Sequence, residues 1–235
     1  MVLGLLWLLM ADLATAGDYV MVIGKGVEVC EAYLKNLNSF PNHPPMVCDR
    51  PLTPKFAAFS KPSWKELDAQ EHLELLKQIW RNFDDLTAEQ FERSPLKDQW
   101  IASLKKPGET KGLAIQMAEL DVDRDGITEF VLDYFEEGSC DPTDQGMYAN
   151  PYGRKYYVLT PDRQGLDAGG SRNFNVLGGR PELFLYNGRV YITTWAGGPN
   201  FRGGELWVIS PANLPGMDKE SCKYTYKSAN QRRHR

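Results

Sequence analysis

The chain has 235 residues, of which 42% are hydrophobic and 25% are charged, which is the composition of a globular protein. Its formal net charge of −4 argues against a general nucleic-acid-binding protein. The 21 glycines, 15 prolines and 11% aromatic residues favour a turn-rich fold that contains β-strands. The length is enough for one large domain or two small ones.

Residues 1–16 have the features of a secretory signal peptide. An apolar run covers residues 2–10, and Ala14-Thr15-Ala16 matches the A-x-A pattern that precedes signal cleavage. The run is too short to span a bilayer. We therefore expect cleavage after Ala16, a periplasmic or secreted protein, and no transmembrane segment. The alternative is a buried N-terminal helix, because no Lys or Arg precedes the run and Asp12 lies late in it.

The chain has four cysteines, Cys30, Cys48, Cys140 and Cys222. None of them forms a C-x-x-C motif, which disfavours a zinc site and thioredoxin-type chemistry. An even number of cysteines in an exported chain predicts two disulfides. We favour Cys30–Cys48 and Cys140–Cys222, because each pair then lies within one compositional half of the chain. The alternative is four buried free thiols.

Residues 17–111 are expected to form a helical N-terminal part. A first helix is predicted over residues 27–39, because four residues fall on one face at helical spacing: Cys30, Tyr33, Leu34 and Leu37. Prolines make residues 41–62 an irregular loop.

Two further helical segments are predicted before residue 112. Ser63 followed by Glu66 is the pattern of a capping box, which satisfies two backbone donors at a helix start, so the second helix is expected to begin at Ser63. The third segment covers residues 87–105 and is interrupted at Pro95. Apolar residues of both segments are core candidates: Leu67, Leu75, Leu76, Ile79, Trp80, Phe91, Leu96, Trp100, Ile101 and Leu104.

Residues 112–227 are expected to be β-rich, and residues 228–235 are expected to be a disordered basic tail. Alternating apolar residues predict strands on both sides of an aspartate-rich loop, and therefore a hairpin. Asn187-Gly188 is the preferred two-residue type I′ turn, which predicts a second hairpin. The predicted strands cover residues 113–117, 130–134, 156–160, 182–186, 189–195, 205–210 and 223–227. The fold class is therefore α+β, with N-terminal helices packed on a mostly antiparallel β-sheet.

The aspartate-rich loop reads Asp121-Val-Asp123-Arg-Asp125-Gly126-Ile-Thr-Glu129. Calcium takes about six to eight oxygen ligands, and alternate residues of a tight turn can aim carboxylates at one point. Gly126 stands where the turn is sharpest, and glycine adopts such a backbone without steric penalty. Four converging acids would repel one another without a cation, which favours bound calcium. The alternative is a solvated acidic turn without a metal.

The loop does not fit an EF-hand, which requires Glu at its twelfth position and flanking helices, because Leu132 stands at that position. Over residues 113–135 it resembles instead the calcium loops of FG-GAP and VCBS-type repeats. The resemblance implies a structural Ca²⁺ whose ligands are Asp121, Asp123, Asp125, the carbonyl of Ile127 and Glu129. A propeller would need several such units, and this chain has one. The loop and residues 181–195 are also similar in style to bacterial exported proteins, a similarity that does not assign an activity.

No catalytic motif stands out in the sequence. G-x-S-x-G, H-E-x-x-H and a complete dinucleotide fingerprint are absent, and histidine occurs three times. Asp133, Glu136 and Glu137 could act as paired carboxylates in glycoside hydrolysis, although consecutive strand residues point to opposite faces. The alternative is a solvated acidic face.

Glycine-rich loops at residues 147–157 and 195–204 contain aromatic and arginine side chains. Such side chains commonly form the centres of binding surfaces. The candidate ligand-binding residues are Tyr148, Tyr152, Phe201 and Arg202. The alternative is that these aromatic residues belong to the core.

Three functions remain open from the sequence. The first is a calcium- and disulfide-stabilised exported module that binds an unknown protein or glycan, or is purely structural, without catalysis. The second is a hydrolase of an envelope polymer that uses acids near residues 129–144. The third is an inhibitor or immunity-type protein that binds another exported protein. A cleft lined by two or more buried acids would favour the hydrolase, and a protruding loop without a cleft would favour the inhibitor.

Overall fold

The computed structural model describes residues 18–40, 51–83, 88–106, 109, 112–137, 154–172, 174, 181–195, 205–213 and 221–227. Within these residues the chain forms two antiparallel sheets, so the fold class is α+β as predicted. In spatial order, the six-stranded sheet contains β1 (Asp18–Ile23), β11 (Cys222–Lys227), β10 (Glu205–Ile209), β9 (Arg189–Trp195), β8 (Glu182–Tyr186) and β2 (Phe59–Ser60). The five-stranded sheet contains β3 (Lys65–Leu67), β4 (Gly112–Leu120), β5 (Glu129–Glu137), β6 (Lys155–Leu159) and β7 (Leu166–Asp167). We expected one sheet, and the structure has two.

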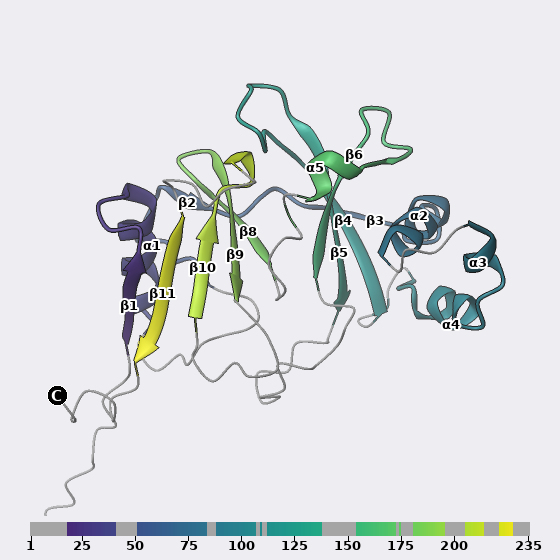
Figure 1. Ribbon diagram of the computed structural model, residues 1–235, viewed down its shortest axis with the longest axis horizontal. Helices are drawn as coiled ribbons and strands as arrows, with labels where there is room; N and C mark the ends of the chain where they lie inside the picture. The colour runs from purple at the N-terminus through teal and green to yellow at the C-terminus, as the bar shows by residue number, and fades with distance from the viewer. Residues whose placement is uncertain are drawn as a thin grey trace, which may run out of the picture.

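The helices are α1 (Glu28–Asn38), α2 (Leu73–Phe83), α3 (Ala88–Glu92), α4 (Leu96–Ser103) and α5 (Ala168–Arg172), with a 3-10 turn at Pro211–Asn213. In Figure 1, α1 lies beside the six-stranded sheet at the left, and α2, α3 and α4 lie beyond the five-stranded sheet at the right. The α1 helix covers the predicted range, and its Cys30 and Tyr33 are buried. The predicted break at Pro95 separates α3 from α4.

Three apolar clusters order the elements into layers. Because side chains alternate along a strand, each sheet buries both of its faces. One cluster lies between the sheets and contains Leu183, Val190 and Ile192 of the six-stranded sheet and Val131 and Val158 of the five-stranded sheet, among others. The outer cluster of the six-stranded sheet includes residues of α1, and that of the five-stranded sheet includes residues of α2 and α4. The order is therefore helix, sheet, sheet, helices.

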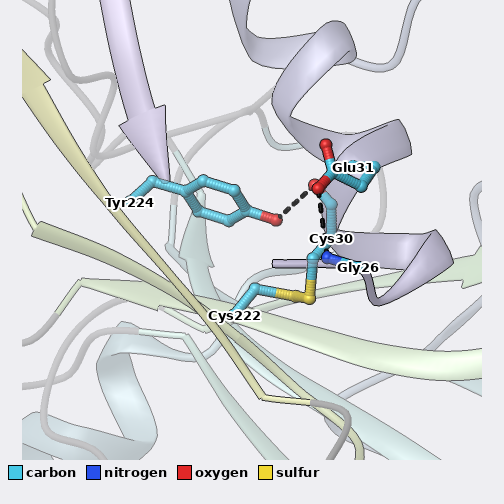
Figure 2. Close-up of a disulfide and its surroundings, with 5 residues drawn as sticks. All are labelled: Gly26, Cys30, Glu31, Cys222 and Tyr224. Carbon is cyan, nitrogen blue, oxygen red and sulfur yellow. Dashed lines mark hydrogen bonds between the residues drawn. A yellow bond between two sulfur atoms is a disulfide. The ribbon is translucent and has the colours of Figure 1, made fainter. Parts of the chain in front are cut away.

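The two ends of the described chain meet in the six-stranded sheet. The first strand, β1, pairs with the last, β11, in antiparallel register. Cys30 of α1 is joined to Cys222 of β11 by a disulfide, and the Tyr224 hydroxyl donates a hydrogen bond to the Cys30 carbonyl oxygen at 2.9 Å (Figure 2). The predicted pairs Cys30–Cys48 and Cys140–Cys222 are therefore wrong, because sheet pairing brings together halves of the chain that composition separates. Cys48 and Cys140 lie outside the described residues.

The second helix does not begin where we predicted. Glu66, the expected partner of a capping box at Ser63, lies in β3 and is paired with Gln116 of β4. Its carboxylate accepts a hydrogen bond from Lys105 Nζ at 2.7 Å. The helix α2 starts at Leu73. The residues of the capping pattern therefore do not begin a helix, because Glu66 pairs with a strand that is distant in sequence.

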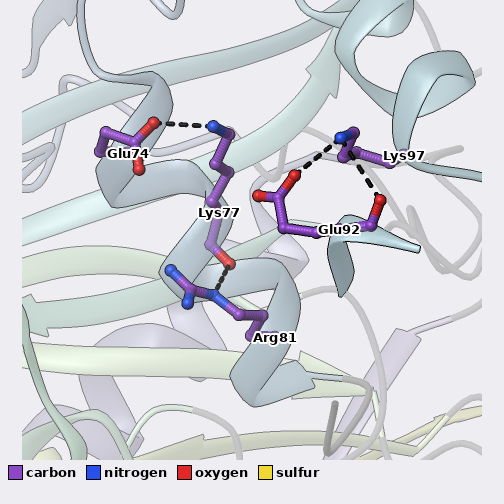
Figure 3. Close-up of polar contacts among 5 residues, drawn as sticks. All are labelled: Glu74, Lys77, Arg81, Glu92 and Lys97. Carbon is purple, nitrogen blue, oxygen red and sulfur yellow. Dashed lines mark hydrogen bonds and ion pairs between the residues drawn. The ribbon is translucent and has the colours of Figure 1, made fainter. Parts of the chain in front are cut away.

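The helices α2 to α4 carry ion pairs on their exposed surface. Lys77 pairs with Glu74 within α2, and Arg81 Nε donates to the Lys77 carbonyl at 3.1 Å (Figure 3). Lys97 of α4 pairs with Glu92 of α3 at 2.7 Å and so connects the helices on either side of Pro95. Such exposed pairs each contribute about 0–1 kcal/mol, so the apolar cluster beneath them stabilises these helices more.

The hairpin of β8 and β9 is confirmed by its pairing and its turn. The strands pair from Glu182↔Thr193 to Tyr186↔Arg189. Asn187 and Gly188 have φ of 49° and 78°, as a type I′ turn requires. Among the described residues, no helix is long and apolar enough to cross a membrane.

Candidate functional site

The acidic loop connects β4 to β5, which pair from Gly112↔Glu137 to Leu120↔Glu129. One ligand oxygen from each of Asp121, Asp123 and Glu129 lies within 4.8 Å of the other two. Oxygen atoms about 2.3–2.6 Å from one calcium ion are at most roughly 5.2 Å apart, so this separation fits a single ion. The three residues could hold a metal ion.

Each of these three carboxylates is held by the loop backbone through one oxygen. The N–H groups of Gly126, Asp125 and Val122 donate respectively to Asp121 Oδ2 at 3.2 Å, to Asp123 Oδ1 at 3.1 Å and to Glu129 Oε2 at 2.9 Å. Within the described part of the chain, the second oxygen of each accepts no hydrogen bond, and Asp121 Oδ1 is buried without a partner. A buried carboxylate oxygen without a partner costs free energy, which a cation would offset.

The electrostatics of the loop agree with this geometry. Burial and the charges of Asp123, Asp125 and Asp121 raise the pKa of Glu129 above its usual value. Gly126 has φ of 89°, the left-handed conformation that glycine adopts without strain, so this predicted feature of the turn is present.

The two other ligands implied by the resemblance stay predictions. The Asp125 carboxylate accepts the N–H of Ile127 at 2.7 Å and is not among the three converging groups. Ile127 is 67% exposed, and its role as a carbonyl ligand is implied only by the resemblance.

A second candidate site is a pocket of about 110 Å³, which we call the inter-sheet pocket. Residues of α1, of the segment between β2 and β3, of β6, β8 and β9, and Arg154 line it. Its aromatic walls are formed by Tyr33, Trp64, Tyr156 and Phe184. Its polar lining consists of Lys61, Arg154, Glu182, Thr193 and the hydroxyl of Tyr156. Pockets with aromatic walls and a few convergent polar groups are the usual form of small-ligand sites.

The wall between Trp64 and Tyr156 is ordered by packing. The two rings stack at 5.9 Å between centroids with an interplanar angle of 16°. The hydroxyl of Tyr156 accepts a hydrogen bond from the N–H of Leu183 at 3.3 Å, which connects β6 to β8. The pocket therefore lies where the two sheets contact each other.

A polar network lies behind the pocket on the sheet face that meets the other sheet. Gln116, Asp133 and Tyr156 are aligned in register across β4, β5 and β6. The Asp133 side chain is fully buried, and its two oxygens accept hydrogen bonds from Gln116 Nε2 at 2.7 Å and Arg154 Nε at 3.1 Å. Burial raises the pKa of Asp133 to about 6, although Arg154 and Gln116 oppose the shift.

The guanidinium of Arg154 is fixed on three sides. Its Nε donates to Asp133, its centre lies 4.9 Å from the centroid of the Phe135 ring, and its Nη1 is 4.0 Å from Glu182 Oε1. The last distance is an ion pair beyond hydrogen-bond range. Neither Nη atom donates a hydrogen bond to any residue that the structure describes, and the side chain is 28% exposed. Arg154 thus brings to the pocket lining a guanidinium with two donor groups that no described residue uses in a hydrogen bond.

The sequence singled out only part of this pocket. Tyr148, Tyr152, Phe201 and Arg202 lie outside the described residues, as do the side chains of Glu136 and Glu137. Asp133 did carry a signal, because an acid within the apolar run Phe130–Phe135 is a candidate buried charge. Arg154 and Glu182 had no such signal, since they are separated in sequence from Asp133 and from each other.

Comparison with known proteins adds no assignment: neither protein-family models, nor curated proteins, nor solved structures gave a match to this chain.

Proposed function

We propose that the protein is an exported, non-enzymatic module that binds a small ligand in the inter-sheet pocket. Calcium at the acidic loop and the Cys30–Cys222 disulfide would stabilise the fold around that pocket. The proposal depends mainly on one observation, which is the inter-sheet pocket itself. Its aromatic residues lie around a half-buried arginine, Arg154, whose two Nη atoms are available as donors, and none of its described lining residues belongs to the acidic loop.

The pocket supports binding more than hydrolysis. Of the lining residues that the structure describes, Glu182 alone is acidic, and Asp133 lies behind Arg154 with both oxygens occupied. Most glycosidases require two carboxyl groups that flank the scissile bond. One acts as the general acid, and the other acts as the nucleophile or the general base. The described lining offers one carboxylate at the surface of the pocket, which does not meet this requirement.

Calcium is the metal that best fits the acidic loop. The available donors are carboxylate oxygens without nitrogen or sulfur ligands, which suits a hard cation. Asp121, Asp123 and Glu129 would hold the ion, with Asp125 and the Ile127 carbonyl as the further ligands implied by the resemblance. The metal would have a structural role there, because it would neutralise carboxylates that the loop backbone already orients.

The disulfide between Cys30 and Cys222 supports export. The Cys30–Cys222 disulfide is typical of proteins that mature in an oxidising compartment. The apolar leader with Ala14-Thr15-Ala16 is consistent with the same destination.

Binding can be tested by ligand-observed NMR with three aromatic probes of pocket size: phenol, benzylamine and benzoate. A cavity of about 150 Å³ encloses benzene. The inter-sheet pocket, at about 110 Å³, is smaller and partly open, so a probe with a single ring is the largest that we expect it to hold. We expect at least one probe to bind wild type and to lose binding in Leu52→Trp, which adds bulk at a lining residue. The control is Val22→Trp, which adds the same bulk at a side chain 57% exposed on β1. If no probe binds, or Leu52→Trp binds as well as wild type, the proposed function is wrong.

Calcium binding can be tested by thermal unfolding with and without chelator. For a site of ~0.1 mM affinity, ~1 mM calcium adds about 1.4 kcal/mol, which raises the melting temperature by a few degrees. Asp123→Asn keeps an oxygen for the Asp125 N–H and removes the charge, and it should abolish the calcium shift. Glu119→Gln, an exposed acid of β4, removes the same charge outside the loop and should retain the shift. A wild-type melting temperature that is the same in calcium and chelator would contradict the metal assignment.

A further inference from the structure

We infer that the inter-sheet pocket recognises a carboxylate, which the two Nη atoms of Arg154 bind side by side. This inference rests on the proposed function and names the class of ligand. The ligand is a small aromatic or apolar acid, or the carboxylate end of a longer chain, because a pocket of about 110 Å³ accepts only a few non-hydrogen atoms.

The orientation of Arg154 is the first argument. Its Nε is used by Asp133 at 3.1 Å, and its face lies on the Phe135 ring, so the guanidinium plane is fixed before any ligand arrives. The remaining edge carries Nη1 and Nη2, which donate to no residue of the described chain. Two parallel N–H groups match the two oxygens of a carboxylate, and such bidentate charged pairs are among the strongest hydrogen bonds in proteins.

The charges around the pocket are the second argument. Lys61 and Arg154 line it as cations, and among the lining residues that the structure describes Glu182 is the single anion. Glu182 is already within 4.0 Å of Arg154 Nη1, and its side chain is 14% exposed. Asp133 compensates the charge of Arg154 from behind, where a ligand cannot reach it. Among the described lining residues, cations therefore outnumber anions by two to one.

The walls are the third argument, and they concern the body of the ligand. Trp64 and Tyr156 stack on each other, and Tyr156, Phe184 and Tyr33 are buried. A flat apolar group beside the carboxylate would be in contact with these rings. A strongly hydrated small anion such as phosphate would lose this contact.

The test compares benzoate with benzamide, which has the same shape and no charge, at fixed ionic strength. We expect benzoate to bind wild type about tenfold or more tightly than benzamide, as hydrogen bonds to a charged group imply. Arg154→Lys, which keeps the charge but loses the second parallel donor, should weaken benzoate severalfold. A second comparison distinguishes a free small acid from the carboxylate end of a longer chain. It uses acetyl-Gly-Phe with a free C-terminus and the same peptide with a C-terminal amide. Binding of the free-acid peptide identifies a chain end as the ligand, and binding of benzoate without binding of the peptide identifies a free small acid.

Removing Arg154 alone would leave Asp133 buried without its partner and could unfold the protein. The double variant Asp133→Asn/Arg154→Gln removes both charges together and should reduce benzoate affinity to that for benzamide. The control is Arg163→Gln, because Arg163 also stacks on an aromatic ring, at 3.8 Å from the Phe130 centroid, but does not line the pocket. It should leave benzoate affinity unchanged.

The failure of this inference differs from the failure of the proposed function. Equal binding of benzoate and benzamide, or preferential binding of benzylamine, would overturn the carboxylate assignment while a binding module remains. Unchanged benzoate affinity in the double variant would overturn it as well. If phenol, benzylamine and benzoate all fail to bind, both the inference and the proposed function are wrong.

Discussion

Replacing Asp133 by asparagine should change how the stability of the protein depends on pH. The Asp133 side chain is fully buried, and burial raises its pKa from 3.8 to about 6. An asparagine amide can still accept from Arg154 and can donate to the Gln116 side-chain oxygen if that amide is reversed. Asp133→Asn therefore removes the titration of the group while retaining its hydrogen-bonding positions.

The sign follows from the raised pKa of the folded state. The folded protein holds the proton of Asp133 more tightly than the unfolded chain, so the contribution of this one group to stability is greatest below pH 3.8 and is lost as pH rises through about 6. One pKa unit corresponds to about 1.4 kcal/mol, so the full loss approaches about 3 kcal/mol. Between pH 4 and 7.5 the unfolding free energy of wild type should fall by about 2 kcal/mol relative to that of Asp133→Asn.

The assay is urea unfolding followed by circular dichroism at several pH values from 4 to 7.5. Subtracting the variant from wild type cancels the other titrating groups. Asp98→Asn on the exposed face of α4 is the control, and its difference from wild type should show no comparable change. A difference that rises with pH would refute the reasoning, because the Arg154 ion pair would then outweigh burial.

Three further predictions concern the covalent and backbone framework. Non-reducing peptide mapping should link Cys30 to Cys222, and replacing both by alanine should cost up to about 5 kcal/mol by chain-entropy estimates, because the sequence separation is 192 residues. A linkage of Cys30 or Cys222 to either of the other two cysteines would contradict the structure. Gly24→Ala should destabilise the protein more than Gly26→Ala in urea unfolding. Both have positive φ, of 97° and 79°, but only at Gly24 would a Cβ lie 2.5 Å from the Cys30 sulfur, so equal losses would argue against that contact. Mass spectrometry of protein from the envelope fraction should find the chain cleaved after Ala16, and an intact leader on cytoplasmic protein would overturn export.

Patterns in the sequence predicted those elements whose structure depends on interactions between residues close in sequence. The helical spacing of Cys30, Tyr33 and Leu37 gave α1 within one residue of its observed ends, and Asn187-Gly188 gave the turn of the β8–β9 hairpin. Of the four acids that the loop's spacing predicted to converge, Asp121, Asp123 and Glu129 do so, and Asp125 is not among the converging groups. In each case the residues that interact are close in sequence, so periodicity and turn chemistry are sufficient.

Pairing between distant segments could not be predicted in the same way. The partner of β1 is β11, at the other end of the described chain, and no periodicity within either strand specifies the other. The disulfide between Cys30 and Cys222 depends on that pairing, so an argument from compositional halves gave the wrong partners. The inter-sheet pocket has the same origin, because Trp64, Arg154 and Glu182 meet only after the two sheets pack.

The acidic loop and the inter-sheet pocket are connected through β5. Glu129 and Asp133 are four residues apart on that strand, so they lie on the same face, roughly 13–14 Å from each other. Arg124 extends from the loop to 5.4 Å from the ring centroid of Tyr191 in β9, so the loop also contacts the other sheet. A cation at Glu129 would fix the start of β5 and the position of the loop between the sheets. Asp133 orients Arg154 from the same strand. The proposed metal would therefore influence the proposed ligand site through the position of β5, without direct contact between the two sites.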